Sequence, residues 1–295
     1  MYNKNNIKTT LSKNKIIPAL YIVSTPIGNK NDITLRAIEV LKLSNIIICE
    51  DTRVSKNLFK LLNISIRDKK WVSYNDFNGS RKIDFVLGEI EKNKTISLVS
   101  DAGTPLISDP GYKLIKKARE KKKKVYPKPG VSSAVAALTA SGLKTDKFSF
   151  IGFLPKNINN SLKILKEYSK LQTTLIVYEK STRLDRLLKL LKENFTSMKI
   201  VCAREITKIY EEYIEINTLN IDHYINNGLK LKGEVTILIE FNKPMLEKKI
   251  TNKILLKELK SYKPSQVSTM LSKITDESRE SIYKRCIALI KNEKI

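Results

Sequence analysis

The sequence is poor in the residue types on which several common enzyme chemistries depend. Its 295 residues include one histidine, His223, and three cysteines, Cys49, Cys202 and Cys286. A histidine base or a histidine metal site is therefore nearly excluded, because the only histidine lies in a helix-to-turn context. The cysteines are odd in number and far apart, so they predict neither a disulfide framework nor a metal site, but buried small apolar side chains.

Long apolar runs and the common nucleotide-binding motifs are also absent. No apolar run approaches the length of a membrane span, and the first residues lack the apolar core of a signal peptide. We therefore expect no membrane contact and a cytoplasmic location. Neither G-x-G-x-x-G nor G-x-x-x-x-G-K-[ST] occurs, which argues against a dinucleotide Rossmann site and a P-loop.

Acidic residues are few relative to basic ones. The chain has 55 Lys and Arg against 30 Asp and Glu, a formal net charge of +25 and a pI near 9.8. Such a protein usually meets a polyanion or an anionic membrane surface. A lysine-rich genome would produce the same excess on any solvated face, so the charge alone is modest evidence for nucleic acid. Residues 1–17 are predicted to form a disordered basic tail.

Short apolar runs alternate with amphipathic segments, and this pattern predicts an α/β fold. Residues 18–145 predict a mostly parallel sheet covered by helices, with Asp32 as the N-cap of a helix over 32–43. Residues 146–245 predict a second α/β domain whose strands are able to pair antiparallel. Residues 250–295 show no strand pattern and predict a small helical domain, either helix-turn-helix-like or a plain capping bundle.

Four loops that contain glycine or proline follow predicted strands: residues 24–29, 100–111, 127–134 and 152–157. In open α/β sheets, ligands bind beyond the carboxyl ends of the strands, so together these loops favour a ligand site over simple turns. The loop SDAGTPLISDPG, residues 100–111, holds two of the ten glycines of the chain. We interpret its bent backbone, more than its side chains, as the binding surface.

Several of these segments, in order and in spacing, resemble one protein family. They are LYIVSTPIGNKNDITLRAIEVL, EDTR, VSDAGTPLISDPGY, IGFLP, CAREITK and KGE. From about Ala19 to Phe241 the chain resembles the ribosomal RNA small-subunit methyltransferase I family of the tetrapyrrole-methylase superfamily, and the helical region resembles the family's C-terminal domain. The resemblance implies two α/β domains with the cofactor in the cleft between them, and a homodimer. It also implies methylation of a cytidine ribose 2′-oxygen in the decoding region of small-subunit ribosomal RNA, with S-adenosyl-L-methionine as methyl donor.

Carried over motif by motif, the resemblance also implies which residues contact S-adenosylmethionine. They are Pro26, Ser100, Asp101, Gly103, Thr104, Ser132, Ser133, Leu154, Ala203 and Gly233. A sulfonium cation favours nearby carbonyl groups and a carboxylate such as Asp101. The alternative roles are a loop cap for Asp101 and capping of the following helix for Ser132 and Ser133. No metal site is expected.

Methyl transfer requires in-line positioning, and it benefits from a base or a cation because a 2′-hydroxyl is a poor acid. The candidates are Glu50, Asp51, Arg53, Arg183, Arg204 and Glu205, with Glu179 as a further candidate base. Ion pairs of the arginines with Glu50, Glu179 or Glu205 are about as well supported by the sequence. No single base is assigned.

The chain departs from the family pattern where the family carries histidines. YNDFN, residues 74–78, and EKSTR, residues 179–183, stand in place of histidine-bearing segments, and Val131 stands where the family usually has proline. Two other functions stay open: a corrin or porphyrin methylase of the same superfamily, or a ribosome-assembly protein without turnover. The net charge and the helical region argue against the first of these.

Overall fold

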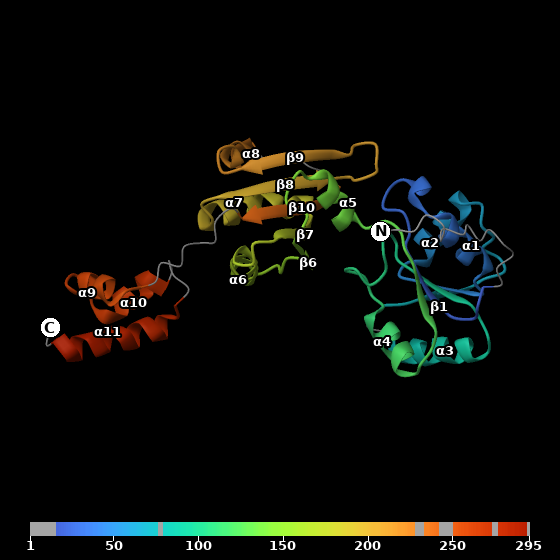
Figure 1. Ribbon diagram of the computed structural model, residues 1–295, viewed down its shortest axis with the longest axis horizontal. Coiled ribbons are helices and arrows are strands. Elements are labelled where there is room, and N and C mark those ends of the chain that lie inside the picture. The colour runs from blue at the N-terminus through green and yellow to red at the C-terminus, as the bar shows by residue number, and fades with distance from the viewer. Residues whose placement is uncertain (1–15, 76–78, 228–232, 242–249, 273–276, 294–295) are drawn as a thin grey trace. The chain divides into compact units, whose positions relative to one another are not determined.

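The computed structural model describes residues 16–75, 79–227, 233–241, 250–272 and 277–293, so the predicted basic tail lies almost wholly outside the described residues. The chain divides into a larger unit, residues 1–242, and a smaller unit, residues 243–295. The larger unit contains two five-stranded sheets with helices between their strands (Figure 1). The predicted α/β class with two sheets and a helical C-terminal part is confirmed.

The first sheet is parallel throughout, as the alternation of apolar runs and helices predicts. Its order is β3-β2-β4-β1-β5, and its strands are β1 (Leu20–Val23), β2 (Ile46–Cys49), β3 (Lys70–Ser73), β4 (Ile96–Val99) and β5 (Val125–Lys128). One face packs against α1 (Leu35–Leu43) and α2 (Thr52–Leu61), and the other against α3 (Gly79–Glu91) and α4 (Tyr112–Glu120). The central strands are apolar on both sides because both faces are covered.

The start of α1 differs from the prediction. Asp32 ends a short 3-10 helix, Lys30–Asp32, which Asn29 caps. The N-cap of α1 is Thr34, whose Oγ1 accepts a hydrogen bond from the N–H of Ala37 at 3.2 Å. Asp32 was the wrong choice because the preceding turn already contains it, and threonine caps a helix by the same chemistry.

The second sheet is mixed. Its order is β6-β7-β10-β8-β9, and its strands are β6 (Phe148–Phe153), β7 (Thr174–Lys180), β8 (Met198–Arg204), β9 (Glu212–Asn217) and β10 (Glu234–Phe241). β6 and β7 are parallel, and the other neighbours are antiparallel. The core on one face is formed with α6 (Ile158–Ser169), α7 (Leu184–Asn194) and α8 (Ile221–Asn227). The antiparallel pairing expected for this region is therefore present.

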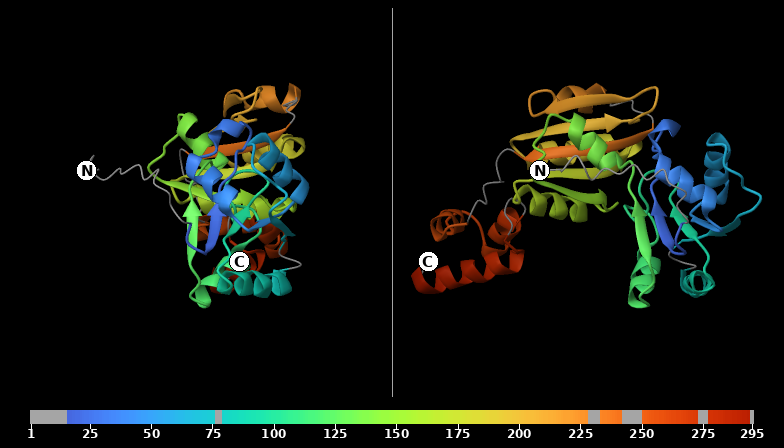
Figure 2. Two further views of the ribbon diagram at one scale, coloured as in Figure 1. Left: turned by 90° about the vertical axis from the view of Figure 1, so that its right-hand side faces the viewer. Right: turned by 45° about the vertical axis from the view of Figure 1, so that its right-hand side comes forward.

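The other face of the second sheet is covered by α5 (Ser133–Ala140), the last helix before the domain boundary predicted after residue 145. Ala134 and Leu138 of this helix are buried in an apolar cluster. The cluster also contains Ile176 of β7 and Leu238 of β10, and Figure 2 shows α5 over this sheet. The chain thus crosses from the first sheet to the second before α5, although the predicted boundary follows it.

The smaller unit consists of helices around a core of its own. They are α9 (Asn252–Leu259), α10 (Pro264–Ser272) and α11 (Arg279–Glu293). Their buried side chains are Ile250, Leu255, Val267, Leu271, Ile282 and Cys286. All three cysteines of the chain are free and buried, as predicted. Across the described parts of the chain, no helix has the length and apolar character needed to cross a membrane.

Candidate functional site

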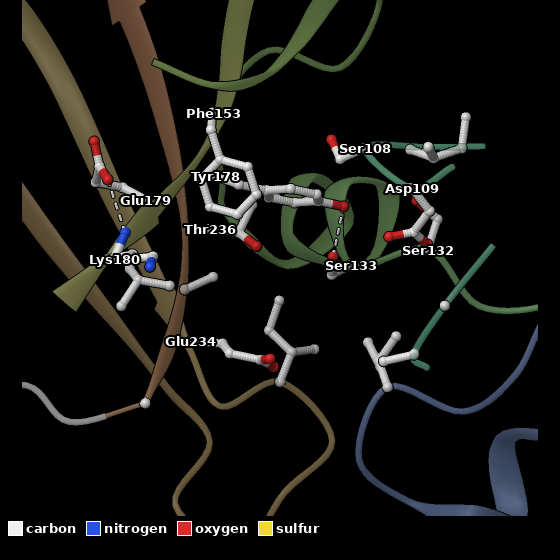
Figure 3. A pocket seen from close by; sticks show the side chains of 18 of the residues that line it. Ser108, Asp109, Ser132, Ser133, Phe153, Tyr178, Glu179, Lys180, Glu234 and Thr236 are labelled. Atoms are coloured by element: carbon white, nitrogen blue, oxygen red, sulfur yellow. Dashed lines mark hydrogen bonds between the residues drawn. The ribbon is translucent and has the colours of Figure 1, made fainter. Parts of the chain in front are cut away.

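A pocket of about 550 Å³ lies between the loops of the first sheet and the second sheet (Figure 3). This volume falls within the range of small-molecule sites, roughly 300–1,000 Å³. Seven of the ten predicted cofactor contacts line it: Asp101, Gly103, Thr104, Ser132, Ser133, Ala203 and Gly233. They come from four separate stretches of the chain, which the fold brings to one place.

Three of the predicted loops, those after β1, β4 and β5, meet at Thr104. Its Oγ1 donates to the carbonyl oxygen of Val131 at 2.9 Å and lies 2.9 Å from Oγ of Ser24. The backbones of Thr25 and Gly103 exchange two hydrogen bonds, of 2.8 and 3.1 Å. These contacts hold the three bends side by side at the carboxyl edge of the first sheet.

The loop after β4 bends through several left-handed residues. Gly103 has φ +79°, and the non-glycine residues Leu106 and Ser108 have φ +74° and +67°. Such angles are uncommon for residues with a Cβ and are retained where the surrounding contacts impose them. Ser100 supplies such contacts from behind, because its hydroxyl donates toward the carbonyl oxygens of Ala102 and Gly103, at 3.2 and 3.0 Å.

Ser100, Pro26 and Leu154 are predicted cofactor contacts that do not line the pocket. Ser100 is buried behind the loop that it braces. Pro26 precedes the lining residue Ile27, and Leu154 is buried in the core of the second sheet directly after the lining residue Phe153. Their roles as cofactor contacts stay predictions.

The two sides of the pocket also touch each other directly. Gly152 of β6 has φ +68°, and a Cβ at this position would lie 2.9 Å from Oγ of Ser108. The hydroxyl of Ser133 donates to Oη of Tyr178 at 2.7 Å, as the dashed line in Figure 3 shows. Ser132, at the N-cap of α5, makes no side-chain capping bond. The two serines are therefore directed to the pocket side and not to the helix backbone.

The second sheet contributes side chains that the sequence analysis missed. Tyr178 of β7, Phe153 of β6 and Thr236 of β10 line the pocket. Burial is the main cause that raises the pKa of Tyr178. The period-two pattern of the strand, which sets Tyr178 on the face of Ile176, was a signal that could have identified it. The position of Phe153 depends on a strand irregularity that no sequence pattern displays.

The pocket is acidic although the chain is basic. Its lining includes four carboxylates, those of Asp101, Asp109, Glu179 and Glu234, and one ammonium, that of Lys180. Burial raises the pKa of Asp109 to about 6, and the nearby charges of Glu50 and Asp101 act in the same direction. The pKa of Asp101 is also raised, again mainly by burial. Glu179 pairs with Arg183, and Glu234 is exposed and pairs with Lys208. The partly buried negative charge that suits a cationic ligand is therefore that of Asp101 and Asp109.

None of the six catalytic candidates is among the residues found to line this pocket. Asp51 accepts the N–H of Arg53 at the start of α2, at 2.8 Å, and pairs with its guanidinium at 2.6 Å. Hydrogen bonds from Arg53 lower the pKa of Asp51 to about 2. The N–H of Asp51 donates to Oδ1 of Asp101 at 3.2 Å, so this segment supports the pocket loop.

The other two arginine candidates form ion pairs. Arg183 pairs with Glu179 at 2.5 Å, as one of the two readings of the sequence had it, and Arg204 pairs with Glu212 at 2.6 Å. Glu179 also accepts the N–H of Lys180 at 2.8 Å, and its carboxylate points away from the Tyr178 ring in Figure 3. Four residues of the segment EKSTR, 179–182, line the pocket. This departure from the histidine-bearing family pattern therefore falls on the pocket lining.

Glu205 holds the backbone of the KGE segment. Its Oε1 accepts the N–H of Glu234 at 3.0 Å and the ammonium of Lys208 at 3.1 Å. A Cβ on Gly233 would lie 2.3 Å from the same oxygen, so only glycine permits this approach. The bond from Glu234 is the main cause that lowers the pKa of Glu205. Glu205 is therefore engaged as a positioning residue for the pocket residues Gly233 and Glu234.

The residues of the pocket fit S-adenosylmethionine, a cation with an amino-acid tail, a ribose and an adenine. Carboxylates offset the positive charge, and Ile27, Ile107 and Ile206 supply apolar surface. Bent backbone and hydroxyl groups offer hydrogen-bond partners for the polar parts. Across the described ranges of the chain, no group of three or more His, Cys, Asp or Glu is arranged to hold a metal ion.

Comparison with known folds agrees with this arrangement. Residues 19–221 match the family model of the tetrapyrrole (corrin/porphyrin) methylases. The crystal structure of diphthine synthase covers 75% of this chain and 90% of its own, with 11% identity and a TM-score of 0.60. That of a cobalt precorrin-4 methyltransferase covers 76% and 95%, with 17% identity and a TM-score of 0.55. Fold and pocket define a methyltransferase of the tetrapyrrole methylase class, which uses S-adenosylmethionine.

Sequence relatives narrow the class to one family. The "Ribosomal RNA small subunit methyltransferase I" of Rickettsia prowazekii is 47% identical over 231 residues, 78% of this chain and 81% of the relative. The protein of the same name from Mesorhizobium japonicum is 35% identical over 286 residues, 96% of each chain. The chain belongs to the ribosomal RNA small subunit methyltransferase I family.

Proposed function

We propose that this enzyme transfers a methyl group from S-adenosylmethionine to the ribose 2′-oxygen of a cytidine in the decoding region of small-subunit ribosomal RNA. The acidic pocket in a chain of net charge +25 is the observation that carries the proposal. The pocket suits a cationic methyl donor, whereas the basic remainder suits a polyanionic acceptor. Relatives of that name, 35–47% identical to this chain, support the choice of ribosomal RNA. We further propose a cytoplasmic homodimer.

The residues of this chain hold the methyl donor and the RNA acceptor in the relative position that methyl transfer requires. Bound S-adenosylmethionine supplies a methyl group that its sulfonium sulfur makes electrophilic. Asp101 and Asp109 would offset the positive charge. The backbone at Gly103 and Gly233 and the hydroxyls at the start of α5, residues 132 and 133, would hold the polar parts. The bonds of Thr104 fix the bends before any ligand arrives, and such positioning is worth roughly 7–11 kcal/mol in well-oriented reactions.

Of the carboxylates of Glu50, Asp51 and Glu205, that of Glu50 is the one whose pKa is raised. Burial raises the pKa of Glu50, and the charges of Asp101 and Asp51 add to the effect. The pKa values of Asp51 and Glu205 are lowered instead, and their carboxylates are engaged in bonds to neighbouring residues. A raised pKa suits a group that accepts a proton near pH 7. Glu50 also adjoins Asp51, whose N–H donates to the pocket carboxylate of Asp101. On this position and the raised pKa together, we propose that Glu50 assists removal of the 2′-hydroxyl proton.

Mapping of ribose methylation tests the function directly. Small-subunit RNA from cells with and without the gene is compared nucleotide by nucleotide, and the deleted cells are complemented with wild type or with Glu50→Gln. We expect one cytidine of the decoding region to lose its 2′-O-methyl group on deletion and to regain it with wild type. An unchanged methylation map would refute the proposal. In that case, methylation of a corrin or porphyrin by the purified enzyme would favour the other superfamily activity, and cofactor binding without transfer would favour an assembly role.

A separate measurement tests whether the acidic pocket binds the methyl donor while the basic remainder of the protein binds the RNA. Binding of the enzyme to isolated small subunits should weaken by about 10³-fold between 50 and 200 mM salt if six or more phosphates are contacted. The affinity for S-adenosylmethionine should change little, because Asp101 and Asp109 are partly shielded from solvent. If the affinities for small subunits and for S-adenosylmethionine depend equally on salt, these separate roles of pocket and basic surface are contradicted.

A further inference from the structure

Phe153 presents an apolar ring to the pocket instead of burying it. The residue is 52% exposed, and its side chain lines the pocket beside Tyr178 (Figure 3). The two ring centroids lie 5.7 Å apart with the planes at 63°. Tyr178 is itself fixed by Ser133 and by the ring of Phe150, whose centroid lies 4.8 Å away. Phe153 therefore rests on an anchored ring while about half of its surface stays open.

A bulge in β6 directs Phe153 into the pocket. Phe150 pairs with Ile176 and Phe153 with Tyr178, so three steps along β6 match two along β7. Strict alternation would place Phe153 on the face of Ile151, which packs against the core beneath α6 and α7. The extra residue places it instead on the face of Phe150, toward α5 and the pocket. Bulges beside functional sites commonly re-aim a side chain in this way.

Gly152 makes the bulge possible. Its φ of +68° is strained for any residue with a Cβ, and a Cβ would meet Oγ of Ser108 at 2.9 Å. Bulges are rare between parallel strands, such as β6 and β7. The segment FIGF thus maintains an unusual backbone whose visible result is one aromatic ring facing the pocket.

We propose that Phe153 stacks on the nucleobase of the nucleotide whose ribose is methylated. This rests on the proposed function. A nucleotide must leave its helical stack to bring its sugar into a pocket, and exposed aromatic rings of RNA-binding proteins receive such bases. The adenine of the cofactor is the other flat ring available. The half-exposed position of Phe153 favours the RNA base, because a macromolecule reaches an open ring without entering the pocket completely.

Two substitutions separate these ligands. Phe153→Leu keeps an apolar side chain but removes the ring face, and Phe153→Trp enlarges the face. For Phe153→Leu we expect KM for unmethylated small subunits to rise about tenfold, as stacking of one base predicts. Its affinity for S-adenosylmethionine, measured by calorimetry, should stay within twofold of wild type. Phe153→Trp should keep KM within about threefold of wild type, and unchanged melting temperatures will confirm that both variants fold.

The outcomes are distinct from those that test the function itself. A wild-type enzyme that methylates no cytidine refutes the proposed function. An active wild type with an unchanged KM in Phe153→Leu refutes stacking, and a parallel loss of cofactor affinity assigns the ring to adenine and overturns the proposal.

Fluorescence gives an independent measurement. Trp71 is the only tryptophan of the chain, so Phe153→Trp in a Trp71→Phe background carries a single reporter. Stacking predicts that its emission is quenched by the RNA substrate and not by S-adenosylmethionine alone. Quenching by S-adenosylmethionine alone, or none with RNA, would overturn the proposal.

Discussion

The two sides of the pocket are built by different means. The first sheet supplies loops whose bent backbones are locked to one another through Thr104 and which carry the carboxylates of Asp101 and Asp109. The second sheet supplies side chains that stand on its strands, among them Tyr178 and Thr236. A parallel sheet gathers loops at one edge, whereas strands of a mixed sheet present their alternate side chains to the ligand. The difference indicates that charge and shape are set by the loop side, and ring contacts by the strand side.

The largest expected effect comes from the charge on the loop side. Asp109 has a pKa of about 6 in the free protein, and a bound cation would lower it because the carboxylate is then favoured. Affinity for S-adenosylmethionine should therefore fall as the pH drops through 6, by about tenfold at pH 5 relative to pH 7.5. Calorimetry in buffers of different ionisation enthalpy should show proton release at pH 6. In Asp109→Asn the affinity at pH 7.5 should be about tenfold lower and the pH dependence should flatten.

The melting temperature of the protein without ligand gives a second test of the Asp109 pKa. The pKa of Asp109 in the folded protein is raised from its ordinary value of 3.8 to about 6. Its stabilising contribution is therefore present below about pH 4 and is lost as the pH rises through 6. Asp109→Asn should thus melt at a higher temperature than wild type at pH 7.5, and the difference should vanish near pH 4. A constant difference at all pH values would contradict the assignment.

The next effect concerns the locking of the loops. Thr104→Val keeps the shape of the side chain but removes the hydroxyl that bonds to Val131 and Ser24. A partner left without its bond costs about 1–3 kcal/mol. We expect about a fivefold loss of affinity for S-adenosylmethionine and a lower melting temperature. Thr139→Val is the matched control, since that exposed hydroxyl donates to the carbonyl oxygen of Ala136 within α5, at 2.9 Å. Equal effects of the two variants would show that the locking has no specific role.

The smallest effect is expected on the strand side. Tyr178→Phe removes the acceptor of the 2.7 Å bond from Ser133 but keeps the ring. A single hydrogen bond of this kind is worth about 0.5–1.5 kcal/mol. Affinity for S-adenosylmethionine should fall about twofold to threefold by calorimetry, whereas Tyr178→Leu should lower it further because the ring is lost. If Tyr178→Phe loses more affinity for S-adenosylmethionine than Thr104→Val does, the strand side contributes more to binding than the loop side.

The sequence predicted the loop side better than the strand side, for a physical reason. Glycine, proline and aspartate after an apolar run mark a bend, and parallel strands bring such bends to one edge, so the loop of residues 100–111 was identifiable as part of a ligand site. The family resemblance then named Asp101, Gly103 and Thr104 within it. Tyr178 lies in a buried strand and reads as core, while Phe153 reaches the pocket through a bulge that depends on Gly152. Such positions depend on how strands that are distant in the sequence pair with each other, which the local sequence does not show.

The catalytic candidates show the complementary limit. Their catalytic roles stay predictions, because a charged residue beside a site serves structure as often as chemistry. Glu205 binds the backbone of Glu234, and Asp51 caps α2 and donates to Asp101. These roles depend on which backbone groups face each carboxylate after folding. A sequence without its fold does not contain that information.

The early crossing of the chain to the second sheet has a consequence for protein engineering. Helix α5 follows the first sheet in the chain but packs on the second, and its first residue bonds to Tyr178. A chimera that exchanges the halves of two relatives at residue 145 would pair α5 with a foreign sheet surface. A crossover near residue 130 keeps the helix with its own partner. Recombination between members of this family should therefore yield folded hybrids more often at that earlier point.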